Sequence, residues 1–439
     1  MMFKPTLNHC FLAASLAYAF AWQLFEPAYQ IAESILILLF LASLARPELR
    51  RDPAVVICLT LFGYLILNYV YLRTQLPEPY DQNARFSRYY LKPLLIPILA
   101  YAIVRAPWLS PWRFLSVAWA GFLATIALQF DQAMLNQLLD GSRQSFGLLN
   151  AQHAGVVFGA ALIALIVFMP RALRAFRGGK RAIWLSFCLV SLIACVGGVL
   201  FTQVRAVWLG LAIALSAGLL IYFILARRRP GAHPVVNITL TSCLLLMVLV
   251  TTALLEFTDI GKRIESRLAI SEETIEELQQ ALSLDSVPMT SSSVRVASWV
   301  AGFRWFVERP LLGWGPGTTD DLIDQSSLFS PSFKSQFGHL HNSYMETLVA
   351  LGLVGTLILA TLTLWIGWTT IRALKTKAMP MDAFVFSWVF FGYWLVVNVF
   401  ESYIMFNTGH FLVACVGAFV YAFYLNSSVT GRASSPLPD

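Results

Sequence analysis

Long apolar runs without charged residues recur along most of this chain and constrain its fold more than any other feature. A helix needs about 20 consecutive apolar residues to cross a bilayer, and several runs reach that length. Hydrophobic residues make up 58% of the 439 residues and charged residues only 13%, against about 25% charged in a typical soluble domain. A soluble fold could not cover so much apolar surface. We therefore predict an all-α, polytopic membrane protein.

The apolar runs predict about twelve transmembrane helices and one long periplasmic loop that itself contains helices. A signal peptide cleaved near Ala19 or Ala21 is the alternative for the first run, and we favour an uncleaved span. The chain then divides into spans one to nine (1–256), the loop (257–340), spans ten to twelve (341–425) and a cytoplasmic tail (426–439). The predicted spans are 8–25, 31–45, 54–72, 91–104, 112–130, 151–169, 182–201, 204–226, 235–256, 341–370, 382–401 and 408–425.

The basic residues indicate the orientation of the spans, because cytoplasmic loops are enriched in Lys and Arg. With both termini cytoplasmic, eighteen of the 31 Lys and Arg residues fall on the predicted inside, including clusters at 171–181 and 227–229. The net charge of +7 is thus typical of membrane topology rather than of a nucleic-acid surface. Thirteen basic residues remain outside, and the loop at 73–92 alone carries four. This excess calls for another explanation.

Residues 257–340 form the one long loop between predicted spans, and loops of this length are usually functional or structured. An acidic helix is expected to begin after Ser271, and a second helix is expected to run from near Ser293 to Glu308, before Pro310. Each helix has an apolar stripe that is expected to be buried. The stripe residues are Ile275, Leu278 and Leu282 in the first helix, and Val296, Trp299, Val300, Phe303 and Val307 in the second.

Three features converge on the predicted outer face: Arg205 at the start of span eight, Arg295 in the first turn of the second loop helix, and His341-Asn342 at the start of span ten. A helix N-terminus is already positive, so an arginine there is best explained by a bound anion such as phosphate. From position alone, lipid-headgroup contacts are the commoner role for an interfacial arginine, and capping or hydrogen bonding is commoner for a histidine.

Metal-ligand spacing is not found in the sequence, and we expect no metal and no cofactor. Asp320, Asp321 and Asp324 are the nearest acidic candidates and are more typical of a solvated surface. Glu346, one turn into span ten, either faces the cavity or takes part in packing. No predicted span carries a charge at its middle, which argues against an ion-coupled transporter. The six cysteines lie in or beside apolar runs, as packing residues do: Cys10, Cys58, Cys188, Cys195, Cys243 and Cys415.

Several of these residues fall in a family pattern. His341-Asn342, nine residues and then Gly352-Leu353-Val354-Gly355 resembles the motif H-[N/S/Q]-x9-G-x-x-G of O-antigen ligases. Arg295, Trp299 and the run Pro310 to Gly315 resemble the segment that precedes it in the wider O-antigen ligase/polymerase family. Arg205, after Thr202-Gln203-Val204, resembles the arginine of that family at the outer end of a mid-chain span. The resemblance covers roughly residues 200–356 by motif.

This resemblance implies a glycosyltransferase of the membrane-embedded C-type fold in a bacterial inner membrane. Such a ligase transfers O-antigen from undecaprenyl diphosphate to lipid A–core at the periplasmic face, without a metal. It implies His341 as the general base and Arg205 and Arg295 as the groups that stabilise the leaving diphosphate. The other candidates for binding phosphates of the donor or acceptor are Arg85, Arg88, Lys92, His339 and Asn342.

Alternatives remain open at this point. An O-antigen polymerase shares the architecture and differs in its acceptor, a protein O-oligosaccharyltransferase belongs to the same superfamily, and a lipid-linked glycan transporter represents another class. His339 is the rival base; if span ten began before it, His339 and His341 would lie about 200° apart on the helix and could not both face the cavity. The expected partners are the lipid-linked donor, lipid A–core and membrane lipids, with no nucleic acid.

Overall fold

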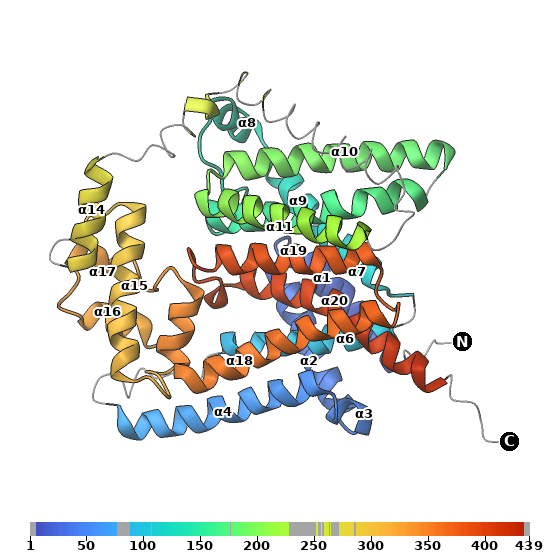
Figure 1. Cartoon of the computed structure of the whole chain (residues 1–439), viewed down its shortest axis with the longest axis horizontal. Helices are drawn as coiled ribbons and strands as arrows, with labels where there is room; N and C mark the ends of the chain where they lie inside the picture. The colour runs from blue at the N-terminus through green and yellow to red at the C-terminus, as the bar shows by residue number, and fades with distance from the viewer. Residues whose placement is uncertain are drawn as a thin grey trace.

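The computed structural model is a bundle of long helices with a smaller helical cluster at one end (Figure 1). It describes residues 6–76, 88–106, 108–175, 177–227, 252, 256, 259–262, 264, 272–284 and 287–433. Within these residues every regular element is a helix and there is no strand, so the all-α prediction is confirmed for them.

The predicted spans coincide with apolar helices, apart from the ninth. Seven helices of the described chain are long and apolar enough to cross a membrane: α2, α4, α7, α9, α10, α18 and α20. Predicted span 235–256 lies outside the described residues except for 252 and 256, so the count of twelve stays a prediction. The helices at the other predicted spans are α1 (Leu7–Ala21), α2 (Glu26–Ser43), α4 (Pro53–Gln75), α6 (Leu95–Arg105), α7 (Pro111–Gln129), α9 (Ala151–Ala175), α10 (Gly178–Phe201), α11 (Arg205–Arg227), α18 (Ser343–Lys375), α19 (Met381–Val397) and α20 (Asn407–Ala433).

Local sequence signals explain where several of these helices begin. The Asp52 carboxylate accepts hydrogen bonds from the backbone N–H groups of Ala54 and Val55, and Pro53 occupies the first turn of α4. Ser110 caps α7 in the same way, before Pro111. An acceptor at the cap position satisfies N–H groups that have no partner inside the helix, and proline there loses no hydrogen bond. A short 3-10 helix, η1 (Arg88–Leu94), leads into α6.

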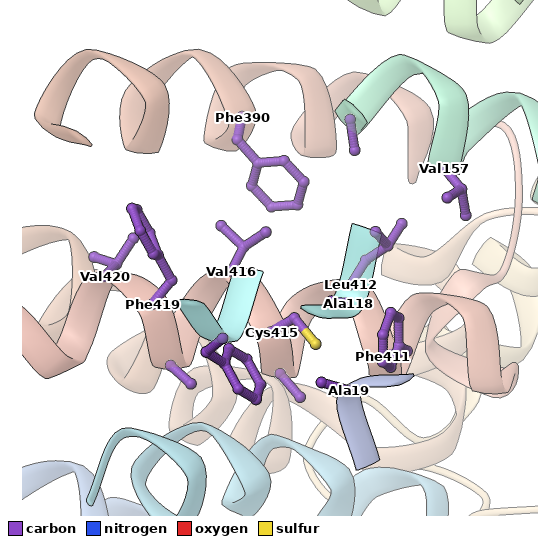
Figure 2. Close-up of a cluster of buried hydrophobic side chains, with 14 of the residues drawn as sticks. Ala19, Ala118, Val157, Phe390, Phe411, Leu412, Cys415, Val416, Phe419 and Val420 are labelled. Atoms are coloured by element: carbon purple, nitrogen blue, oxygen red, sulfur yellow. The ribbon is translucent and has the colours of Figure 1, made fainter. Parts of the chain in front are cut away.

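The core of the bundle lies around α20. Figure 2 shows Phe411, Cys415 and Phe419 of α20 among side chains from α1, α7, α9 and α19, including Val157 and Phe390. Helix α20 packs most extensively on α6, while α11 packs on α19 and α10 on α9. The described cysteines are free thiols, and all except Cys10 are buried, as expected for packing residues.

The loop helices form a cluster with its own small core at one end of the bundle. They are α14 (Glu272–Ser283), α15 (Ser291–Glu308), α16 (Thr319–Gln325) and α17 (Pro331–Lys334). Their core includes Ala297, Trp305, Ile323 and Phe333. The short helix α3 (Pro47–Arg50) and the C-terminal end of α20 lie at the opposite end of the bundle (Figure 1). The predicted basic residues near α3 are thus far from the loop cluster, although the membrane side of each remains a prediction.

The predicted apolar stripes of α14 and α15 are buried only in part: Val296 and Val300 pack against the core of the cluster, but neither stripe is the most buried face of its helix. Helix α15 buries a face of mainly small residues instead, and a Cβ added at Gly302 would lie only 2.9 Å from Cδ1 of Leu340. Small residues let the helix approach the segment before α18 closely, which a hydrophobicity pattern does not register. The predicted stripe residues that are more than half exposed are Ile275, Leu282, Phe303 and Val307.

Candidate active site

Helix α18 begins immediately after the His-Asn pair. The side-chain Oδ1 of Asn342 accepts hydrogen bonds from the backbone N–H groups of Tyr344 (2.9 Å) and Met345 (3.1 Å) and so caps the helix. This leaves only the amide nitrogen of Asn342 for its predicted contact with substrate. His341 has φ = +50°, a left-handed conformation that is uncommon for a residue other than glycine. The cap and this turn set the direction of the His341 ring.

Nine residues further on, α18 is kinked at Gly352, where φ is +61° and ψ is −168°. The turn at residues 310–315 lies against this kink and exchanges backbone hydrogen bonds with it. We call this ladder the latch. In two of its four bonds the turn donates: Trp314 N–H to Val349 O (2.8 Å) and Gly315 N–H to Ala350 O (2.9 Å). In the other two, α18 donates: Leu353 N–H to Pro310 O (2.8 Å) and Val354 N–H to Leu311 O (3.1 Å).

The latch explains why its glycines are needed. A Cβ added at Gly352 would lie 2.3 Å from the carbonyl oxygen of Leu311, and one added at Gly313 would lie 2.6 Å from the backbone nitrogen of Gly352. Both glycines also have positive φ. The Pro–Gly run and the glycine nine residues after His341-Asn342 are therefore two halves of one contact.

Helix α4 supports the latch from the side. The Tyr64 hydroxyl donates to the carbonyl oxygen of Leu351 (2.5 Å), and the Asn68 amide donates to that of Leu312 (2.8 Å). The kink interrupts α18 at the Leu351 carbonyl, and the Leu312 carbonyl lies in the turn outside any helix, so polar side chains from α4 supply partners to both. The first two turns of α18 are thus held at both ends.

Both histidines of the predicted site meet one carboxylate, that of Glu401, in the segment between α19 and the short helix η2 (Tyr403–Met405). Glu401 Oε1 is 3.0 Å from His339 Nε2 and 3.5 Å from His341 Nδ1. The two imidazole rings lie 4.1 Å apart between centroids. Since α18 begins only at Ser343, the two histidines are not on a helix, and they face the same place.

Arg295 approaches the same carboxylate through a glutamine. Its Nε donates to the carbonyl oxygen of Phe400 (2.9 Å), and its Nη1 donates to that of Ser291 (2.6 Å). When the Gln152 amide is oriented to satisfy its neighbours, its oxygen accepts from Arg295 Nη2 (2.7 Å) and its nitrogen donates to Glu401 Oε2. The arginine, the glutamine and the glutamate therefore form a continuous polar chain.

Arg205, the first residue of α11, reaches the start of α15, where its Nη2 donates to the Ser292 hydroxyl (3.1 Å). Arg295 binds the adjacent Ser291. Two arginines from distant parts of the sequence thus meet at one helix N-terminus, which is itself positive. Arg304 on the same helix is exposed and takes no part, as the nine-residue spacing predicts.

Burial and charge give the two histidines different protonation preferences. Burial lowers the pKa of His341, and the nearby Glu401 carboxylate offsets this only in part. Burial also opposes the charged form of His339, but the hydrogen bond and negative charge of Glu401 outweigh it and raise the pKa of His339. Burial would raise the pKa of Glu401, yet the two histidines hold it well below its usual range. The cluster favours a neutral His341 beside an ionised Glu401.

Comparison with known families matches this part of the chain. Residues 190–360 fit the family model described as O-antigen ligase. This segment of the chain is therefore similar to O-antigen ligases. The match runs from α10 to α18, so it contains the two arginines, the latch and both histidines of the site. No curated protein matches the chain. Members of the matched family are membrane glycosyltransferase-like enzymes, so the match supports an enzymatic role.

Two residues of the site could not be predicted from the sequence. Gln152 and Glu401 both lie outside the matched segment 190–360. Glu401 is 3% exposed and is the last residue of the eleventh predicted span, 382–401. Its charge at the end of an apolar run was the only signal in the sequence. Gln152 is uncharged and gave no signal at all.

The remaining predicted phosphate ligands lie elsewhere or are already paired. Lys92 forms an ion pair with Glu33, and both side chains are largely buried. Arg85 and the side chain of Arg88 lie outside the described residues. Glu346 is 1% exposed and accepts hydrogen bonds from Leu340 N (3.0 Å) and the Ser402 hydroxyl (3.3 Å). Its role in holding the histidine segment matches the packing alternative.

Potential metal ligands come together at one place in the described chain. These are His339, His341 and Glu401, whose ligand atoms all lie within 4.8 Å of one another. The sequence prediction of no metal considered acidic pairs and cysteines and did not consider this set.

Proposed function

We propose that this protein is an O-antigen ligase that transfers O-antigen polysaccharide from undecaprenyl diphosphate to lipid A–core at the periplasmic face of a bacterial inner membrane. Both termini are then cytoplasmic and the loop cluster is periplasmic. The observation that carries the proposal is the connection of His341 to Arg295 through Glu401 and Gln152. Arg205 reaches the start of the same helix, α15. A base near two cations suits attack of a hydroxyl on a sugar with a diphosphate leaving group.

His341 acts as the general base in this proposal. The acceptor hydroxyl attacks the anomeric carbon while its proton passes to Nε2 of His341, and the bond from the sugar to the diphosphate breaks with its electrons going to the diphosphate oxygen. A neutral imidazole is required for this step, and the lowered pKa of His341 supplies it. Glu401 orients the ring at Nδ1 and stabilises the imidazolium that forms. Direct displacement inverts the anomeric centre, and no metal takes part.

His339 is the weaker candidate for the base. Its Nε2 is engaged by Glu401 at 3.0 Å, and its pKa is raised, so the charged form predominates over a wider pH range. A protonated imidazole has no lone pair to accept a proton. We assign His339 to phosphate binding or to holding Glu401 in place.

Arg205 and Arg295 stabilise the diphosphate as its charge develops. A guanidinium presents paired N–H donors that match phosphate oxygens, and a fixed cation needs no rearrangement during the reaction. Arg295 is held by Phe400, Ser291 and Gln152, whereas Arg205 is exposed and is able to turn toward a ligand. Arg295 therefore suits a contact with the diphosphate that is in place before the donor binds, and Arg205 suits a contact that forms after the donor binds.

The lipid tail of the donor requires an apolar site within the membrane. A cavity of about 370 Å³ lies among α7, α9, α10 and α20 and is lined almost wholly by apolar side chains. Along α9 it extends from Val157 to Ala175, which at 1.5 Å per residue is roughly 27 Å. The end of the cavity at Val157 is one helical turn from His153, which lies beside the site. We place part of the isoprenoid chain there.

The deciding experiment is transfer by purified protein, with undecaprenyl-diphosphate glycan as donor and lipid A–core as acceptor. His341→Ala, Arg205→Ala and Arg295→Ala should each abolish product at normal protein levels. Arg304→Ala is the matched control, since it removes an arginine from the same loop helix without touching the site. A longer lipid-linked glycan in place of modified lipid A–core would identify a polymerase, and absence of any transfer would reject the proposal.

A further inference from the structure

We propose that His339, His341 and Glu401 form a binding site for Zn²⁺, and that a bound ion switches the enzyme off. The inhibitory half of this inference rests on the proposed function, because it uses His341 as the base. The binding half rests on the geometry of three side chains alone.

The ligand atoms are of the kind that zinc prefers. Zinc sites in proteins commonly combine imidazole nitrogens with a carboxylate oxygen at about 2.0–2.2 Å, and a tetrahedron with such bonds has edges of roughly 3.4 Å. Glu401 Oε1 lies 3.0 Å from one imidazole nitrogen and 3.5 Å from the other. An ion placed between them therefore requires small side-chain rotations and no movement of the backbone.

The site is built rather than accidental. His341 is only 9% exposed, and neither of its ring nitrogens has a hydrogen-bond partner. The backbone on both sides of it is fixed, by the Leu340 N–H bond to Glu346 before it and by the Asn342 cap after it. A buried imidazole without a partner is costly, and coordination at Nδ1 would satisfy it.

The two oxygens of Glu401 have separate surroundings. Oε2 faces the Gln152 amide and, through it, Arg295, whereas Oε1 faces the two histidines. The arginine side therefore orients the carboxylate from behind, as the outer shell of a metal site does. Mg²⁺ and Ca²⁺ need several oxygen ligands, whereas two imidazoles and one carboxylate suit ions that bind nitrogen strongly.

Coordination would remove the base. A neutral imidazole that gives its Nδ1 lone pair to an ion carries its proton on Nε2 and is then a donor only. The acceptor hydroxyl would lose the atom that takes its proton. Three protein ligands leave a fourth tetrahedral position, where a phosphate oxygen of the donor would hold the ion more firmly.

Cobalt serves as the probe for binding, because tetrahedral Co²⁺ absorbs visible light strongly and occupies zinc sites. We expect purified, EDTA-treated protein to bind one equivalent of Co²⁺ with such a band, and Zn²⁺ to abolish it. His339→Ala, His341→Ala and Glu401→Gln should each weaken binding by more than about tenfold. His9→Ala, an exposed histidine on α1, is the matched control and should bind as the wild type does.

Transfer activity tests the second half. Stoichiometric Zn²⁺ should suppress transfer, and EDTA should restore it. Binding is measured without substrates. A normal cobalt band in a protein that transfers nothing would therefore refute the proposed function but not the metal site. A missing band in well-folded wild-type protein, or a band that survives all three substitutions, would overturn the metal site. Full transfer with the ion bound would overturn inhibition.

Discussion

Gly352→Ala is the sharpest test of how the site is held. The glycine has φ = +61° and ψ = −168°, a region open essentially only to glycine, where another residue costs about 1–3 kcal/mol. The added Cβ would also lie 2.3 Å from Leu311 O, closer than real contacts allow, so the latch must separate locally. Losing two of its four hydrogen bonds adds roughly 1–3 kcal/mol. We expect a total destabilisation of about 2–6 kcal/mol.

Thermal unfolding in detergent, followed by tryptophan fluorescence, measures the effect. Gly367→Ala is the matched control, because it lies in the same helix with nothing within 4 Å of an added Cβ. That change should leave stability unchanged or raise it by about 0.5–1 kcal/mol. Gly352→Ala should unfold several degrees lower and lose most transfer activity, since α18 positions His341. If both variants unfold together with the wild type, the latch does not have the role assigned to it.

Further predictions concern the polar chain and the far end of the bundle. Glu401→Gln should lower kcat for transfer about 100-fold with a smaller change in KM, because the base loses its orienting charge. Arg295→Lys should lower transfer more than tenfold, since an ammonium cannot replace the fork between Phe400 and Gln152. Arg171→Ala should lower the unfolding temperature, because it breaks the two-pronged pair with Asp382 at the other end; Arg171→Ala with Asp382→Asn should recover part of the loss.

The spans were predictable because lipid imposes one simple demand, a helix with an apolar surface throughout. The proximity of Arg205, Arg295 and His341 was predictable because all three occupy unusual places at or just before helix starts. Glu401 and Gln152 were not, because their role depends on contacts with Arg295, more than a hundred residues from either. The pairing of Lys92 with Glu33 is hidden for the same reason.

The loop helices show a second limit. Apolar periodicity identifies the side of a helix that avoids water, yet α15 is positioned by its small residues, which pack closely against the segment before α18. The prediction that His339 and His341 could not share a face assumed a helix through both. The structure begins α18 at Ser343, because the Asn342 cap excludes an earlier start.

The polar chain from Arg295 to Glu401 crosses the borders of the segment that defines the family. Residues 190–360 supply the cations and the histidines, while the bundle on either side supplies the amide and the carboxylate that align them. A chimera that exchanges only residues 190–360 with a related protein would therefore separate the cations and histidines from the residues that align them. To exchange donor preference without loss of turnover, the chimera should also carry the matching Gln152 on α9 and Glu401 after α19.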